Sequence, residues 1–168
     1  MIMDHYFINE HTIALLPAKQ IEYQTTVIET NNILRINKTP LQIIKDACIS
    51  NWSSYEGRRR AVIHHTKYKH KVPIPIHIEK QICAFPTHSP THFDCKWIFS
   101  NHILQLKKCT TSCRSVVKFT NNRQLKVNVS PYILEKQFQR ALSCMTYMSN
   151  SLKITYETTW NKAPESVQ

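Results

Sequence analysis

Glycine is almost absent from this sequence of 168 residues, since it occurs once, at Gly57. A glycine-rich loop that binds phosphates through its backbone amides is therefore excluded. The sequence also lacks the HExxH pattern of zinc proteases, the GxSxG pattern of serine hydrolases and a closely spaced acidic pair of the nuclease kind. A cysteine–histidine nucleophile pair is the one catalytic alternative, because six cysteines and nine histidines offer several combinations. We expect no enzyme, no catalytic residue and no cofactor.

Long apolar runs and a signal peptide are missing as well. No apolar stretch approaches the roughly 20 residues that a membrane-spanning helix needs. The N-terminal apolar run Ile13–Leu16 is short, and Asp4 stands where a signal peptide would be cationic. We expect a soluble cytoplasmic protein with no membrane partner, in which the cysteines are free thiols. The cysteines are Cys48, Cys83, Cys95, Cys109, Cys113 and Cys144.

Acidic residues are scarce in the middle of the chain, although the formal net charge of the whole chain is +11. Residues 1–40 have a net charge of −1, residues 41–128 combine 15 basic with 4 acidic side chains, and residues 129–168 have a net charge of +1. A charge excess concentrated in this way favours a polyanionic partner, with nucleic acid ahead of an acidic membrane surface. The alternative is a solvated charged face without a partner.

The order of the residues predicts an α+β fold of antiparallel strands and two helices. Residues 6–16 indicate a strand or a short hairpin. Residues 23–37 and 115–129 predict hairpins that turn at Asn-Asn pairs, which tolerate positive φ where glycine is absent. Further short strands are expected at 81–85 and 97–107, separated by a loop, and the segment 109–113 is expected to be a polar turn.

Each Asn-Asn hairpin is followed by a helix start signal, Thr39-Pro40 or Ser130-Pro131. The first helix is expected at 40–50 and the second from 131 to about 150. The first has an apolar stripe of Leu41, Ile44 and Cys48, with Ile43 and Ala47 beside it. The second has a stripe of Leu134, Phe138, Leu142 and Met145, with Ala141 and Met148 beside it.

This recurrence of hairpin and helix suggests an internal repeat. The segment TNNILRINKTP at 30–40 is similar to TNNRQLKVNVSP at 120–131. One interpretation is a pseudo-twofold molecule with two related halves. The other is that a hairpin followed by a helix is a common arrangement in α+β proteins. We expect one DNA-binding domain at 1–150 and a flexible C-terminal tail at 151–168.

Histidines and cysteines are concentrated between residues 88 and 113. The candidates for a zinc site are His88, His92 and Cys95, followed by Cys109 and Cys113. The close CxxC spacing of structural zinc sites is absent, and Pro90 separates the two histidines. We therefore expect no metal, and scattered core thiols with loop histidines are the favoured interpretation.

Aromatic residues are interleaved with the basic ones in the same central part of the chain. Single-strand binders stack bases on such residues, but Trp52, Tyr55 and Trp97 are better interpreted as core anchors. No sequence pattern of an RRM, a KH domain or a zinc finger is present.

The basic segment that follows Gly57 is the strongest candidate site. We expect a polar turn over 51–57 and an extended strand over 58–71, in which Lys67, Lys69 and Lys71 share one side. Pro73 and Pro75 then favour an edge strand. Arginines on a turn or ribbon suit the narrow minor groove of A·T-rich DNA better than a recognition helix in the major groove. The candidate DNA-binding residues are Arg58, Arg59, Arg60, Lys67, Lys69, Lys71, Lys118, Arg123 and Lys126.

Several of these motifs occur in an order that resembles a known family. They are PLQIIKDAC at 40–48, SSYEGRR at 53–59, Thr66-Lys67, His70-Lys71, Pro73-Ile74, FPTH at 85–88 and Trp97-Ile98. IALLP at 13–17 and FTNN at 119–122 fit as well. Over most of its length the chain resembles the bacterial competence transcription factor family ComK.

The resemblance implies a DNA-binding activator of competence genes that binds paired A/T-rich boxes, mainly through the minor groove, as a homo-oligomer near the nucleoid. It matches Arg58, Arg59, Lys67 and Lys71 to basic positions of the family. RNA polymerase and a proteolytic adaptor are further candidate partners. Family members continue into a longer tail than follows Trp160 here, and the loop 88–113 departs from the family pattern. The alternatives are an RNA-binding protein or a relative that acts through protein contacts.

Overall fold

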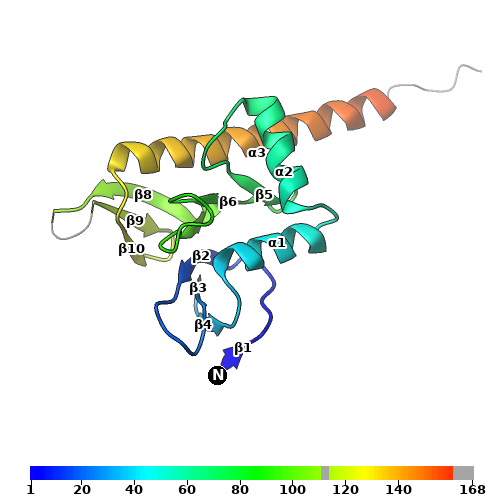
Figure 1. The fold of residues 1–168 in the computed structure, drawn as a ribbon. Helices are drawn as coiled ribbons and strands as arrows, with labels where there is room; N and C mark the ends of the chain where they lie inside the picture. Colours follow the sequence, from blue (N-terminus) through cyan, green and yellow to red (C-terminus); the bar gives the residue numbers. More distant parts are fainter. Residues whose placement is uncertain (111–113, 161–168) are drawn as a thin grey trace, which may run out of the picture.

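The computed structural model describes residues 1–110 and 114–160, with side chains up to Lys153. In this part of the chain the fold is α+β, with three helices and mostly antiparallel strands (Figure 1). The helices are α1 (Pro40–Ser50), α2 (Tyr55–Thr66) and α3 (Pro131–Trp160), with a short 3₁₀ turn η1 (Ser100–His102). The expectation of two helices was therefore wrong, because it left out α2.

The strands form two sheets. In spatial order, the seven-stranded sheet consists of β1 (Ile2–Met3), β4 (Ile33–Ile36), β3 (Thr25–Glu29), β2 (Thr12–Pro17), β7 (Trp97–Phe99), β6 (Ile82–Pro86) and β5 (Ile74–His77). The small sheet consists of β10 (Gln124–Val127), β9 (Ser115–Phe119) and β8 (Ile103–Lys108). The pairing of β1 with β4 is parallel, and the other pairings are antiparallel.

The central strands β7 and β6 of the seven-stranded sheet are buried on both faces, so they are apolar on both sides. Trp97 and Phe99 of β7 point into one core together with α1, whereas Ile98 between them points into a second core with the small sheet and α3. Alternation along a strand directs successive side chains to opposite faces. This is why β6 and β7 read as continuous apolar runs.

The two predicted Asn-Asn hairpins are confirmed as β3–β4 and β9–β10. Each leads into a capped helix. Thr39 Oγ1 accepts from the Gln42 amide while the Gln42 side chain accepts from the Thr39 amide, which closes a capping box. Ser130 Oγ accepts from the Ile133 amide. The hairpins lie in different sheets with different neighbours, and the pseudo-twofold relation between them stays a prediction.

The apolar stripes predicted for α1 and α3 are confirmed with one exception. Ile44 and Cys48 of α1 are fully buried, but Leu142 of α3 is 40% exposed and lies outside the stripe. Gln137 and Cys144 take places on the buried side instead. Helix α3 also continues to Trp160, past its expected end near residue 150.

The expected polar turn over 51–57 is present only at residues 51–53, and the prediction for residues 55–66 was wrong. Residues 55–66 form α2, and Gly57 lies inside its first turn without positive φ. Ser54 caps this helix by accepting from the Gly57 amide at 2.9 Å. A Cβ atom at Gly57 would lie 3.0 Å from the capping oxygen, which explains a small residue there. Because α2 buries only Tyr55 and Val62, its sequence has little of the apolar periodicity that reveals a helix.

Two strand predictions need correction. The expected strand 97–107 is divided by η1, so that β7 lies in the seven-stranded sheet and β8 in the small sheet. Of the strand or short hairpin expected at 6–16, the structure has a single strand that begins only at Thr12. Conversely, the prediction from Pro73 and Pro75 is confirmed, since β5 is an edge strand of the seven-stranded sheet.

The core-anchor interpretation of the aromatic residues holds for two of the three. Tyr55 and Trp97 are buried with ring centroids 6.4 Å apart. Trp52 is 99% exposed and has φ 59°. It follows the C-cap of α1, where a left-handed residue ends the helix and glycine is the usual choice. In a chain with one glycine, tryptophan occupies this position.

Candidate nucleic-acid interface

Helix α2 is fixed against the body of the protein by the side chain of its first arginine. Arg58 Nη1 donates to the Pro75 carbonyl and Arg58 Nη2 donates to the Asn51 carbonyl, each at 2.7 Å. Its Nε is buried and has no hydrogen-bond partner in the described part of the chain. The guanidinium therefore joins α2 to the edge strand β5 and to the turn after α1, which is a structural role.

The other predicted arginines of α2 remain on the surface. Arg60 is exposed, and Arg59 is half-buried with a long hydrogen bond of 3.5 Å from Nη2 to the Lys69 carbonyl. After α2 the chain forms a loop over 67–71 and not the expected strand. The side chains of Lys67 and Lys69 are therefore not aligned by a strand pleat, although both are exposed.

This loop is conformationally constrained at both ends. Lys67 has φ 62° at the C-cap of α2, and Lys71 has φ 48°. Non-glycine residues in this region are held there by their surroundings. Lys67 Nζ donates to the His64 carbonyl at 2.8 Å, which places a positive charge at the negative end of the helix dipole.

The predicted cations fall into a first group on α2 and the 67–71 loop and a second group on the small sheet. The second group consists of Lys118, Arg123 and Lys126. The register pairs Lys126 with Val116 and Val116 with Lys107, and Lys118 follows two residues later on β9. Since Val117 and Phe119 face the core, the three lysines share the outer face. Lys107 was not among the predicted site residues. Arg123 lies in the β9–β10 turn and is half-buried.

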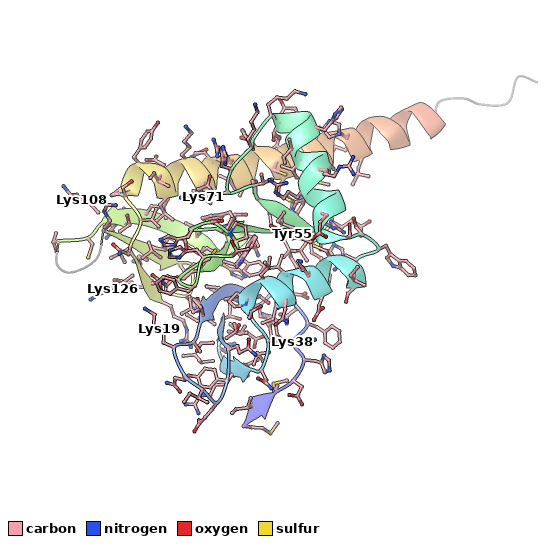
Figure 2. All side chains as sticks on the ribbon, in the orientation of Figure 1. Lys19, Lys38, Tyr55, Lys71, Lys108 and Lys126 are labelled. Carbon is pink, nitrogen blue, oxygen red and sulfur yellow. The ribbon has the colours of Figure 1, made fainter. Side chains whose placement is uncertain are left out.

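Helix α2 and the small sheet, which carry the two predicted groups of cations, lie against different parts of α3. Leu134 and Phe138 of α3 pack in the core with the small sheet, whereas Cys144 and Met148 pack with Val62 of α2. Figure 1 shows the same separation along α3. In Figure 2, Lys108 and Lys126 lie at the small-sheet end and Lys71 lies nearer to α2.

Among the described residues, some basic side chains form salt bridges with carboxylates and others do not. The salt bridges use lysines that lie outside both predicted groups, with N–O separations between 2.7 and 3.7 Å. The paired lysines are Lys19, Lys38, Lys45, Lys80 and Lys96. The nine predicted residues form none of these bridges, so their charge is not neutralised by a carboxylate within the described chain.

Among the described residues, no group of three or more histidine, cysteine or acidic side chains is placed to hold a metal. His88 and His92 stack on each other with ring centroids 4.9 Å apart. Burial lowers the pKa of His88, with a smaller contribution from the neighbouring imidazole. The absence of a metal from the protein stays a prediction, since Cys113 lies outside the described residues.

The free-thiol prediction holds for four cysteines and fails for one. Cys48, Cys83, Cys95 and Cys144 are free and buried. Burial raises the pKa of the Cys48 thiol to about 11, which keeps it protonated and unreactive near neutral pH. Cys109 is disulfide-bonded, contrary to expectation.

Comparison with known proteins identifies the family. The model of the ComK protein family matches residues 3–153. This chain belongs to the ComK family. It is also 34% identical over 140 residues to the competence transcription factor of Bacillus subtilis (strain 168), a match that covers 82% of this chain and 72% of that protein. No solved structure matches.

Membership confirms the resemblance seen in the ordered motifs and settles the class of function. ComK proteins are competence transcription factors and not enzymes. The chain therefore has a role in transcription regulation, in agreement with the missing enzyme motifs. None of the described helices is long and apolar enough to cross a lipid bilayer.

Proposed function

We propose that this member of the ComK family is a DNA-binding activator of competence genes that binds A/T-rich boxes mainly through the minor groove. The observation that carries the proposal is the unneutralised positive charge on α2 and the 67–71 loop, where Arg59, Arg60, Lys67 and Lys69 have no carboxylate partner among the described residues. Phosphate contacts from such residues supply most of the affinity for a duplex.

The corrected secondary structure changes the reasoning about the groove. Residues 58–66 are helical, so the argument from an extended ribbon does not apply to them. The proposal for the minor groove rests on what the resemblance in the ordered motifs implies and on the chemistry of arginine, which is attracted to the enhanced negative potential of narrow A·T-rich minor grooves. The groove therefore needs a direct test.

The deciding experiment is a duplex-binding titration monitored by fluorescence anisotropy. The protein is titrated with a duplex that contains two spaced A/T tracts, a G/C duplex of equal length and a single-stranded RNA of equal length. We expect the A/T duplex to bind most tightly, and a minor-groove-binding drug to displace the protein. Preference for the RNA would support the alternative class, and absence of binding to any duplex at low salt would exclude DNA binding.

A matched pair of variants locates the contact. Arg60→Ala removes an exposed, unpaired cation from α2. The slope of the logarithm of the duplex-binding constant K against the logarithm of the salt concentration should therefore become less steep by about one. Lys80→Ala removes a lysine that is paired with Glu10 at 3.2 Å, and the slope should not change. Equal slopes in both variants would remove α2 from the interface.

A further inference from the structure

Helix α3 contributes cations that lie beside the 67–71 loop. Arg140 packs its guanidinium over the Tyr68 ring, 4.8 Å from the ring centroid, and its Nη1 donates to the His70 carbonyl at 3.3 Å. The same Nη1 donates to Gln137 Oε1 at 3.1 Å. Arg140 therefore holds the loop against α3 by stacking and by hydrogen bonding.

Gln137 holds the other end of the loop from a buried position. Its side chain is 3% exposed, and its Nε2 donates to the Lys71 carbonyl at 2.7 Å. A longer bond of 3.4 Å reaches the Pro86 carbonyl at the end of β6. A buried amide with two backbone acceptors is a costly group to misplace. Lys71 is thus held in its left-handed conformation, φ 48°, by a neutral side chain from α3.

Lys136 continues this surface along α3. It lies four residues before Arg140 and therefore on the same side of the helix. Its side chain is exposed, and Nζ lies 5.9 Å from the centroid of the Tyr132 ring. Neither Lys136 nor Arg140 takes part in the salt bridges of the described chain. The unpaired charge that begins on α2 therefore crosses the loop and runs on to α3.

We propose that α3 is part of the duplex-binding surface of this protein, with Lys136 as a phosphate contact and Gln137 and Arg140 as positioning residues that hold the basic loop. The proposal rests on the proposed DNA-binding function and extends it to a helix that contains none of the site residues predicted from sequence. The connected surface comprises Arg59, Arg60, Lys67, Lys69, Lys71, Lys136 and Arg140.

The contact role is tested by the salt dependence of duplex binding. Lys136→Ala should lower the slope of log K against log salt by about one. Lys153→Ala is the matched control, because Lys153 is an exposed cation on the same helix beyond the loop contacts. Its slope should equal that of the wild type. An unchanged slope for Lys136→Ala would exclude α3 as a phosphate contact.

The positioning role is tested with variants that keep the charge of the protein. Gln137→Ala removes no charge, and Arg140→Lys keeps the charge but loses the planar group that stacks on Tyr68. We expect both variants to bind the duplex more weakly with a reduced salt slope, because the loop cations lose their fixed positions. Wild-type binding by a folded Arg140→Lys variant would overturn the positioning role of Arg140, and wild-type binding by a folded Gln137→Ala variant would overturn that of Gln137.

The two levels of the proposal fail in different ways. If the wild-type protein does not bind duplex DNA at low salt, the proposed function fails and the α3 surface fails with it. If the wild type binds and the α3 variants match it, only the role of α3 is overturned. Circular dichroism of each variant checks that the helices are retained.

Discussion

The Arg58 side chain and the Pro75 carbonyl are joined by a hydrogen bond of 2.7 Å that connects α2 to the edge strand β5. This bond gives the first arginine of the basic segment a different role from its neighbours. It also occupies an edge-strand carbonyl that would otherwise be open to pairing with another chain. The most conspicuous charge run in the sequence therefore contains a structural residue and surface residues side by side.

Arg58→Ala should destabilise the protein. The substitution leaves the carbonyls of Pro75 and Asn51 without their charged donor, and we expect the free energy of unfolding to fall by about 2 kcal/mol. Arg60→Ala is the matched control, because Arg60 is exposed, and its effect should stay within about 0.5 kcal/mol. Urea denaturation followed by circular dichroism measures both. Equal stability of the two variants would contradict the structural role of Arg58.

Ser54→Ala should weaken α2 specifically. The hydroxyl accepts from the Gly57 amide at 2.9 Å, and loss of an N-cap of this kind costs about 1 kcal/mol. The neighbouring Ser53 does not cap the helix, so Ser53→Ala should change stability by less than about 0.5 kcal/mol. Denaturation midpoints of the two variants give the comparison. If Ser53→Ala proved the more damaging, the assigned cap would be wrong.

Trp52→Gly should stabilise the protein. Trp52 has φ 59° and an almost fully exposed side chain, so the ring contributes no packing that the glycine would lose. A non-glycine residue in the left-handed region costs about 1 kcal/mol or more, and we expect a gain near that size. Trp52→Ala keeps the Cβ atom and should give no comparable gain. A glycine variant no more stable than the alanine variant would refute the strain at this position.

Acidification should destabilise the protein through His102. Its side chain is 8% exposed, and its Nε2 is buried without a hydrogen-bond partner among the described residues. Burial lowers the pKa of His102 below its ordinary value near 6.5. The unfolded chain therefore takes up a proton at a higher pH than the folded protein, and stability is lost as pH falls below about 6.5.

The His102 effect is isolated by substitution. The free energy of unfolding is measured between pH 5 and pH 8 for the wild type, His102→Gln and His64→Gln. His102→Gln should flatten the dependence, whereas His64→Gln should not, because His64 is exposed. If the free energy of unfolding of His102→Gln depended on pH as steeply as that of the wild type, other groups would be responsible for the acid sensitivity.

The lysines on the small sheet provide an independent test of the interface. Lys118 and Lys126 share its outer face, and replacing both by alanine should lower the salt slope of duplex binding by about two if this face contacts phosphates. The variant should remain as stable as the wild type, since neither side chain packs in the core. An unchanged slope would restrict the interface to α2, the 67–71 loop and α3.

Local signals in the sequence predicted the two hairpins, α1 and the beginning of α3. Asn-Asn turns, cap residues and apolar periodicity act between neighbours in the chain, so they do not depend on the rest of the fold. The same reasoning failed for α2. Few residues of that helix are buried against the rest of the protein. It is held by its N-cap and by Arg58, and neither of these produces an apolar periodicity in the sequence.

By itself, the sequence determined the α+β class, the concentration of positive charge and, through its ordered motifs, membership of the ComK family. The tertiary structure decided which cations are available, because that depends on partners distant in the chain. Arg58 is turned inward by carbonyls of Asn51 and Pro75, and Arg140 is brought to the loop at His70 by the packing of α3. Charge can be counted along a sequence, but the direction in which a charged side chain points and the groups that lie beside it are set only when the chain is folded.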